Sequence, residues 1–217
     1  MPDVNPIYFI ILIAIMGLLP FFLMMVTSYV KIVVVTSLVR NALGVQQIPP
    51  AMVLNGLAII LSIFVMAPVG HQTWALAKTV DLPAAHVEPR HLSEAIETLS
   101  PPLKSFLMKN TERYVLTTLI ESAKRIWPES LRSMANNESF LMLIPAFAIS
   151  ELTEAFKVGF LLYLPFIVID LIISNILLAM GMMMVSPMTI SLPFKLLLFV
   201  TLEGWLKVCQ GLLFSYA

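Results

Sequence analysis

The chain has 217 residues, of which 59% are hydrophobic and only 12% charged, and its 13 basic and 13 acidic residues give no formal net charge. Ordinary soluble domains carry about twice that charged fraction, so this composition indicates a membrane protein or an obligate subunit of a larger assembly. The balanced charge leaves no basic surface for a phosphate backbone, which argues against nucleic acid as a partner. Cys209 is the only cysteine, which excludes an intrachain disulfide and a thiolate metal cluster.

The N-terminal part of the chain, residues 1–70, predicts an apolar helical hairpin. Residues 7–26 carry no charge and are long enough to span a bilayer, for which about 20 apolar residues suffice. No positively charged start or small-residue cleavage site precedes them, so we expect this first run to be retained. The run continues past Lys31 to turn signals within 41–50, and a second apolar run covers 51–69.

Residues 71–138 predict a soluble, helical insert. They hold eight Lys or Arg, eight Asp or Glu and all three His. Apolar residues recur at spacings of three and four over 92–99 and 103–127, and the Pro-Pro pair at 101–102 and Trp127-Pro128 punctuate these stretches. The His spacings do not match a metal site, so we expect no metal.

Residues 139–217 predict a C-terminal apolar helical hairpin with a Met-rich bend. An apolar run covers 158–185, Pro187 and Pro193 are expected to bracket a loop, and the last run covers 194–216. The predicted fold class is therefore all-α, with membrane-associated helical hairpins on both sides of the insert. Four prolines in the apolar runs should kink or end their helices: Pro20, Pro68, Pro145 and Pro165.

The basic residues near the segment ends predict the orientation. Lys31 and Arg40 lie near the first turn and Lys195 near the second, so these turns should be cytoplasmic. The insert and both termini then lie on the outer side of the membrane.

Glu151, Glu154 and Lys157 open an amphipathic helix. Two interpretations stay open: an interfacial helix start with local pairing of Glu154 and Lys157, or contact with a neighbouring subunit or a pore lining. The acidic residues lie off an apolar stripe formed by Leu152, Ala155, Phe156, Gly159, Phe160 and Tyr163.

Asp170 lies in an otherwise apolar run, where a carboxylate is costly unless it faces protein or water. Hydrogen bonding at a helix–helix seam is the first interpretation. A place in a conducting path and a role in a proton relay are the alternatives, although few other ionisable residues lie at membrane depth.

Met182, Met183 and Met184 are consecutive, so they cannot all face one seam of a helix. If Gly181 and Pro187 let the backbone leave helical geometry, the three flexible thioethers could fill one opening. Lipid-facing filler is the alternative interpretation.

The sequence contains no Gly-rich phosphate loop and no nucleophile elbow, so nothing indicates an enzyme or a cofactor. A small-solute transporter should show two related halves and a polar midplane site, and neither is evident. A scaffold without a conducting role would leave the methionine run unexplained.

Four motifs are specific: Arg40 to Pro50 (RNALGVQQIPP), 145–152 (PAFAISEL), 181–187 (GMMMVSP) and 193–205 (PFKL through EGW). Together they resemble the SctR/FliP family, the export-gate subunit of type III secretion systems and flagella. The resemblance covers about two thirds of the chain and leaves the insert unmatched. Val45 and residues 64–70 look more like the injectisome branch, with the flagellar branch as the alternative.

The resemblance implies a pentameric ring that is joined by S- and T-type small subunits into a helical cone around an export channel. A U-type switch subunit and a large export-gate protein would associate with it. Unfolded secreted polypeptides would cross the bacterial inner membrane through it, with much of the assembly at the periplasmic level. The family's methionine gasket would correspond to Met182, Met183 and Met184, and its sensitive acidic residue to Glu151. Asp170 and Lys157 are further candidates for assembly or gating.

Overall fold

The computed structural model describes residues 6–45, 47–79 and 95–217. Helices account for most of the described residues, which contain no strand, and this confirms the all-α prediction. Part of the helix predicted over 92–99 lies outside the described residues, as do His86 and His91. The described elements are α1 (Pro6–Met25), α2 (Tyr29–Ala42), α3 (Ala51–Ala77), α5 (Pro101–Lys109), α6 (Arg113–Ile126), the 3-10 helix η1 (Glu129–Met134), α7 (Phe140–Ala179), α8 (Pro187–Thr201) and α9 (Gly204–Phe214).

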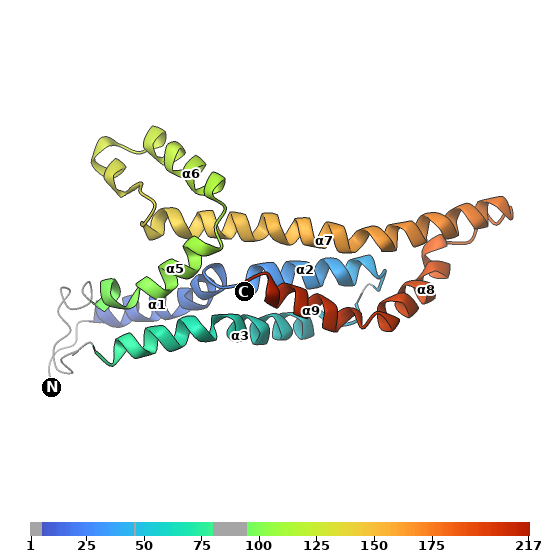
Figure 1. The fold of residues 1–217 in the computed structure, drawn as a ribbon, viewed down its shortest axis with the longest axis horizontal. Helices are drawn as coiled ribbons and strands as arrows, with labels where there is room; N and C mark the ends of the chain where they lie inside the picture. Colours follow the sequence, from blue (N-terminus) through green and yellow to red (C-terminus); the bar gives the residue numbers. More distant parts are fainter. Residues whose placement is uncertain (1–5, 46, 80–94) are drawn as a thin grey trace.

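Helix α2 lies at the centre of the molecule, between the long helix α7 and helix α3 (Figure 1). Helices α8 and α9 fold back from the far end of α7, so that the C-terminus lies near the middle of the molecule. Helix α6 and η1 project from the opposite end of α7. The largest buried cluster joins α2 to α7, α8 and α9 and includes Ile32, Val35, Val39, Phe166 and Phe199.

Helix α7 is a single helix of 40 residues. At 1.5 Å per residue it is about 60 Å long, twice the hydrocarbon thickness of a bilayer, which is about 30 Å. The charged residues that precede the predicted run at 158 are therefore part of the same helix. Only about half of α7 could lie in a bilayer core at one time.

The four prolines lie inside helices and end none of them: Pro20 in α1, Pro68 in α3, and Pro145 and Pro165 in α7. Of the two expected effects, a kink or a helix end, the second is therefore excluded at all four positions. Each proline removes one backbone donor, and the surrounding turns keep their own hydrogen bonds.

The insert helix predicted over 103–127 is divided into α5 and α6. Side chains satisfy the backbone at this break: Asn110 Nδ2 donates to the Phe106 carbonyl at 2.8 Å and Thr111 Oγ1 donates to the Leu107 carbonyl at 2.6 Å. The Glu112 N–H donates to Ser150 Oγ of α7 at 3.0 Å. Because this last contact comes from a distant helix, periodicity within the insert could not predict the break.

The loop predicted between Pro187 and Pro193 is wrong, because both prolines belong to α8. The turn lies earlier, at 180–186. Gly181 there has a φ of 74°, and the Met182 N–H donates to the Leu177 carbonyl at 2.9 Å. A glycine in the left-handed region with this backbone hydrogen bond ends α7.

Helices α3 and α7 are long and apolar enough to cross a membrane. Two bent pairs could each form a further span: residues 16–25 with α2, at an angle of 67°, and α8 with α9, at 58°. The four predicted apolar segments therefore correspond to two unbroken helices and two broken ones.

Gly159 allows α2 and α7 to approach closely. A Cβ atom at Gly159 would lie 2.2 Å from Leu38 Cδ1 and 3.2 Å from Leu38 Cβ, whereas one at Gly56 in α3 would meet no atom within 4 Å.

We predict that Gly159→Val lowers the free energy of unfolding by about 1–3 kcal/mol more than Gly56→Val does, because only the first overpacks a helix contact. Thermal unfolding of both variants in mild detergent measures the difference. Equal melting temperatures would contradict this account.

Candidate functional site

A buried ion pair joins the two central helices. Lys31 Nζ of α2 lies 2.9 Å from Glu151 Oε1 of α7, and the two side chains are 7% and 1% exposed. Removing two charges from water costs several kcal/mol per ion unless further polar partners compensate. The pair therefore requires additional contacts in its surroundings.

Tyr216 supplies these contacts from the C-terminal end of the described chain. Its hydroxyl donates a hydrogen bond to Glu151 Oε2. The Lys31 ammonium lies 4.4 Å from the centre of the Tyr216 ring, which is a cation–π distance. Burial, and then the neighbouring Glu151 carboxylate, raise the pKa of Tyr216, so the phenol stays protonated and remains a donor.

The same tyrosine contacts the insert. Its ring stacks on Phe106 of α5 with centroids 6.0 Å apart, and Lys109 Nζ donates to its backbone carbonyl at 3.3 Å. The site around Glu151 thus joins α2, α5, α7 and the C-terminal segment.

The buried face of α7 differs from the predicted apolar stripe. Phe156 and Phe160 of that stripe are exposed, whereas Glu151 is buried together with the small residues Ala155 and Gly159. The predicted stripe therefore contains both buried and exposed residues, and Glu151, which we placed off it, is buried beside its small members. Helix α2 packs against the side of α7 where small residues let the backbones approach, and the rings of Phe156 and Phe160 face outward.

A second charge pair joins α7 to α8. Lys195 Nζ lies 2.6 Å from Asp170 Oδ2 and also donates to the Ala42 carbonyl at 3.1 Å. Ser191 Oγ donates to Asp170 Oδ1 at 2.5 Å. These contacts match the helix-seam interpretation of Asp170. In the sequence, Lys195 served only as a basic residue that predicted the orientation. A lysine in an apolar run also indicates a buried partner, and that signal was missed.

Lys157 forms an exposed cluster on α7. Its ammonium lies 2.9 Å from Glu154 Oε1, so the predicted local pairing is present, and 2.9 Å from Glu112 Oε1 of the insert. Solvent screens such exposed pairs, so this cluster adds little stability. Its Glu112 contact, which sequence reasoning missed, connects the insert to α7.

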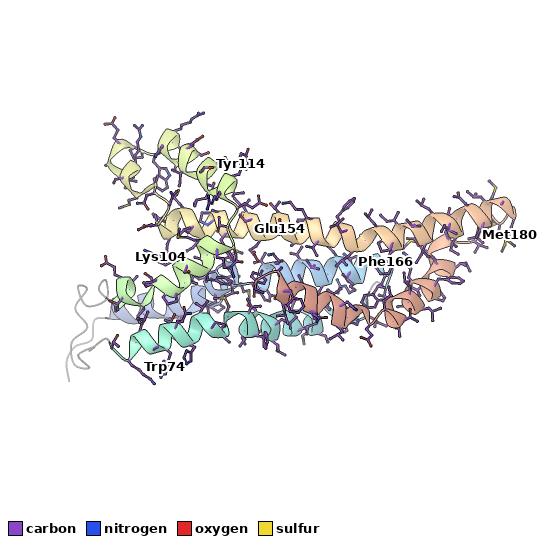
Figure 2. The ribbon with its side chains drawn as sticks, in the orientation of Figure 1. Trp74, Lys104, Tyr114, Glu154, Phe166 and Met180 are labelled. Atoms are coloured by element: carbon purple, nitrogen blue, oxygen red, sulfur yellow. The ribbon has the colours of Figure 1, made fainter. Side chains whose placement is uncertain are left out.

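The three consecutive methionines lie far from both charge pairs. Met182, Met183 and Met184 belong to the turn at 180–186 and are 40%, 82% and 101% exposed. Figure 2 shows the preceding Met180 at the end of the molecule opposite Tyr114. The backbone leaves helical geometry at this turn, and the site residues fall into separate groups at the centre and at the tip. Among the described residues, no group of three or more His, Cys, Asp or Glu could hold a metal ion.

The buried pair leads to a prediction that contrasts two glutamates on one helix. Glu151→Gln leaves the Lys31 ammonium buried without its counter-ion, and breaking a buried pair typically costs about 3–5 kcal/mol. Glu154→Gln removes only an exposed charge. We expect the first variant to lower the yield of folded, assembled protein severalfold and to reduce secretion, and the second to behave like the parent. Size-exclusion yield and a secretion assay measure this, and equal, near-parental results for both variants would refute it.

Comparison with known proteins assigns the chain to a family. The FliP family matches residues 12–212. The Yop proteins translocation protein R of Yersinia pestis is 50% identical over 216 residues, which cover 100% of this chain and 98% of the relative. The virulence protein YscR of Salmonella typhimurium is 47% identical over 205 residues, 94% of each chain, and the harpin secretion protein HrcR of Erwinia amylovora is 43% identical over 212 residues, 98% of this chain and 97% of the relative. The resemblance seen in the four sequence motifs is confirmed, and the chain belongs to the FliP family.

Proposed function

We propose that this chain is a pore-forming core subunit of the type III secretion export apparatus and conducts unfolded polypeptides across the bacterial inner membrane. Family membership and relatives named as translocation, secretion and virulence proteins make it a component of such an apparatus. These names favour the injectisome over the flagellar system. The single observation that carries the pore proposal is the exposed methionine turn at the tip of an otherwise tightly joined hairpin.

Assembly into a ring is supported by the outer surface of the C-terminal hairpin. Phe156 and Phe160 of α7 and Leu197 and Val200 of α8 are all more than half exposed. Apolar patches of this extent mark contacts with lipid or protein. In our proposal five copies form the ring, and S- and T-type subunits complete the cone. The U-type switch subunit and the large export-gate protein bind to this core.

The length of α7 supports a position that is partly above the membrane. A helix about 60 Å long exceeds the bilayer core twofold, and the charged insert packs against its first half. We therefore propose three parts: an N-terminal hairpin at 1–70, a periplasmic insert at 71–138 and a C-terminal hairpin at 139–217. The insert and much of the ring would lie at the periplasmic level.

The methionine turn would act as the gasket of the channel. A channel wide enough for a polypeptide leaks ions if it stays open, and rings of apolar side chains can block ions by dewetting. Methionine suits this role because its unbranched side chain can yield to varied shapes. In our proposal Gly181 and Pro187 set the bend, while Glu151, Asp170 and Lys157 hold the hairpins in the geometry that assembly requires.

The gasket is tested by changing Met182, Met183 and Met184 together to alanine. We expect the assembled complex to conduct small ions several times better than the parent in planar bilayers, because the apolar constriction becomes wider. Changing the exposed Met52 and Met108, which lie on α3 and α5, to alanine is the matched control. A fully assembled triple variant with parental conductance would exclude the gasket role.

The ring is tested separately by native mass spectrometry of the complex in mild detergent. We expect a mass that corresponds to five copies, because the exposed apolar surface makes the monomer unstable on its own. A stable monomer that recruits no other apparatus subunit would contradict the proposal.

A further inference from the structure

The hydroxyl group of Ser191 is buried where α8 meets α7. Ser191 is 0% exposed, and its Oγ lies 2.5 Å from Asp170 Oδ1. The same oxygen lies 3.2 Å from the Met188 carbonyl of its own helix. A hydroxyl has one proton to donate, and its hydrogen bond to an ionised carboxylate is shorter and stronger than one to a neutral carbonyl. We therefore assign the proton of Ser191 to Asp170.

Two donors from successive turns of α8 hold this one carboxylate. Lys195 follows Ser191 by four residues, which places both side chains on the same face of α8. Lys195 Nζ contacts Asp170 Oδ2 at 2.6 Å, while Ser191 contacts Oδ1. The long, flexible stem of a lysine can follow a partner that shifts. The short serine side chain reaches Asp170 only when α8 lies at one position along α7, so Ser191 is the more exact of the two contacts.

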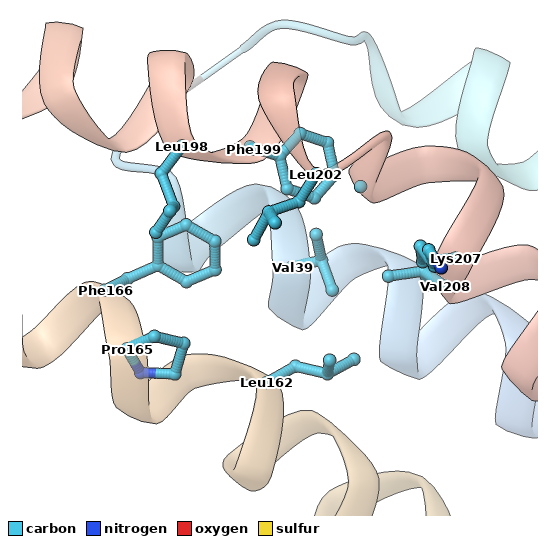
Figure 3. A pocket seen from close by; sticks show the side chains of 10 residues that line it. Val39, Leu162, Pro165, Phe166, Leu198, Phe199, Leu202, Lys207 and Val208 are labelled. Atoms are coloured by element: carbon cyan, nitrogen blue, oxygen red, sulfur yellow. The ribbon is translucent and has the colours of Figure 1, made fainter.

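Apolar packing fixes the position of α8 less exactly than this contact does. Among residues 171–190, all of which the structure describes, only Leu177 is buried. On the other side of Ser191, the two helices flank an apolar pocket of about 270 Å³ (Figure 3). Its lining includes residues of both helices: Leu162, Pro165 and Phe166 of α7, and Leu198 and Phe199 of α8.

The rings of Phe166 and Phe199 do touch beside this pocket, with centroids 6.3 Å apart. Hydrophobic contact is non-directional, so it tolerates sliding of one helix along the other. A hydrogen bond weakens steeply when its length or angle changes. The register of α8 on α7 therefore depends on the polar contact at Asp170.

The methionine turn lies directly beyond this contact. Ser191 is in the second turn of α8, which begins at Pro187, and Met184 precedes Pro187 by three residues. On α7, the nine residues from Asp170 to the helix end at Ala179 span about 14 Å. The tip of the hairpin is thus a lever whose base is the Asp170–Ser191 contact, and a shift or rotation of α8 at the base moves the turn.

We propose that Ser191 is a positioning residue for the methionine turn. Its hydroxyl holds α8 in the register on α7 that places Met182, Met183 and Met184 at the constriction of the channel. This inference rests on the proposed function for the role of the turn as a gasket. The place of the turn relative to the rest of the chain can be measured without export or conductance.

The first test measures that place in the full chain, co-expressed with the other apparatus subunits and purified in mild detergent. In a Cys209→Ser background, the exposed residues Ile60 of α3 and Met183 are changed to cysteine and carry nitroxide labels. Dilution with unlabelled copies restricts pulsed electron paramagnetic resonance to the distance within one chain. We expect Ser191→Ala to shift or broaden the distance distribution of the parent, and Ser191→Thr, which keeps a hydroxyl, to preserve it.

Thr201→Ala is the matched control on the same helix. It removes an exposed hydroxyl that donates to the Leu198 carbonyl of α8 itself at 3.0 Å, so the distance distribution should not change.

The second test asks whether the Ser191 hydroxyl acts through the methionines. The assembled Ser191→Ala complex should conduct small ions several times better than the parent in planar bilayers. In the background of the triple alanine variant of Met182, Met183 and Met184, the same change should add no further conductance, because the gasket is already lost. A serine with a merely structural role would act alike in both backgrounds.

A parental distance distribution in the assembled Ser191→Ala variant would overturn the proposal, as would a change that Ser191→Thr fails to prevent. A displaced turn with parental conductance, in a complex whose triple methionine variant leaks ions, would also overturn it. If the triple methionine variant itself keeps the parental conductance, the pore proposal fails, and the label distance still decides whether Ser191 places the turn.

Discussion

The buried contact between Lys31 and Glu151 is the constraint on which the arrangement of the central helices depends. Either charge alone would be isolated in an apolar interior, so α2 and α7 must meet in the one register that brings them together. Lys195 fixes the opposite end of α2 by contacting both its Ala42 carbonyl and Asp170. Helix α2 is therefore attached to the α7–α8 hairpin at both ends. Buried ion pairs are better suited to fixing register than to adding stability, and this is the role that the geometry supports.

Tyr216 extends this constraint to the insert. Its hydroxyl donates a hydrogen bond to Glu151 and its ring stacks on Phe106 of α5. Its backbone carbonyl accepts a hydrogen bond from Lys109 of the same helix. The exposed contact of Lys157 with Glu112 adds a second connection between α7 and the insert. A displacement of the insert would therefore reach the buried pair through side chains that are already in contact. The insert and the apolar helices are connected through these side-chain contacts.

The interior and the exterior of the molecule follow opposite rules. Inside, small residues such as Ala155 and Gly159 allow close helix contacts and most charges have partners. Outside, large apolar side chains cover α7 and α8 and the methionine turn is exposed, while Glu203 and Lys207 form no ion pair within the described part of the chain. An isolated chain in water could not maintain such a surface. Its features are those of a subunit whose remaining contacts are supplied by neighbouring chains and lipid.

Features that depend on residues close together in the chain could be predicted from the sequence. Apolar composition and periodicity predicted an all-α, membrane-associated chain, and four motifs indicated the family. Glycine and proline act locally, so a bend could be expected at the Gly181–Pro187 segment, although the loop was placed too late in the chain. The buried face of α7, and the place of Glu151 on it, depend instead on how the helices pack. Its partners Lys31 and Tyr216 lie 120 residues before and 65 residues after it in the chain. The side of α7 with Phe156 and the side that packs against α2 are similarly apolar. Helix α2 packs against the second side because its small residues allow a closer approach. A pattern along one helix contains no information about the shape of its neighbour. Burial, charge partners and helix breaks, such as the one at Glu203 between α8 and α9, therefore depend on how the helices pack.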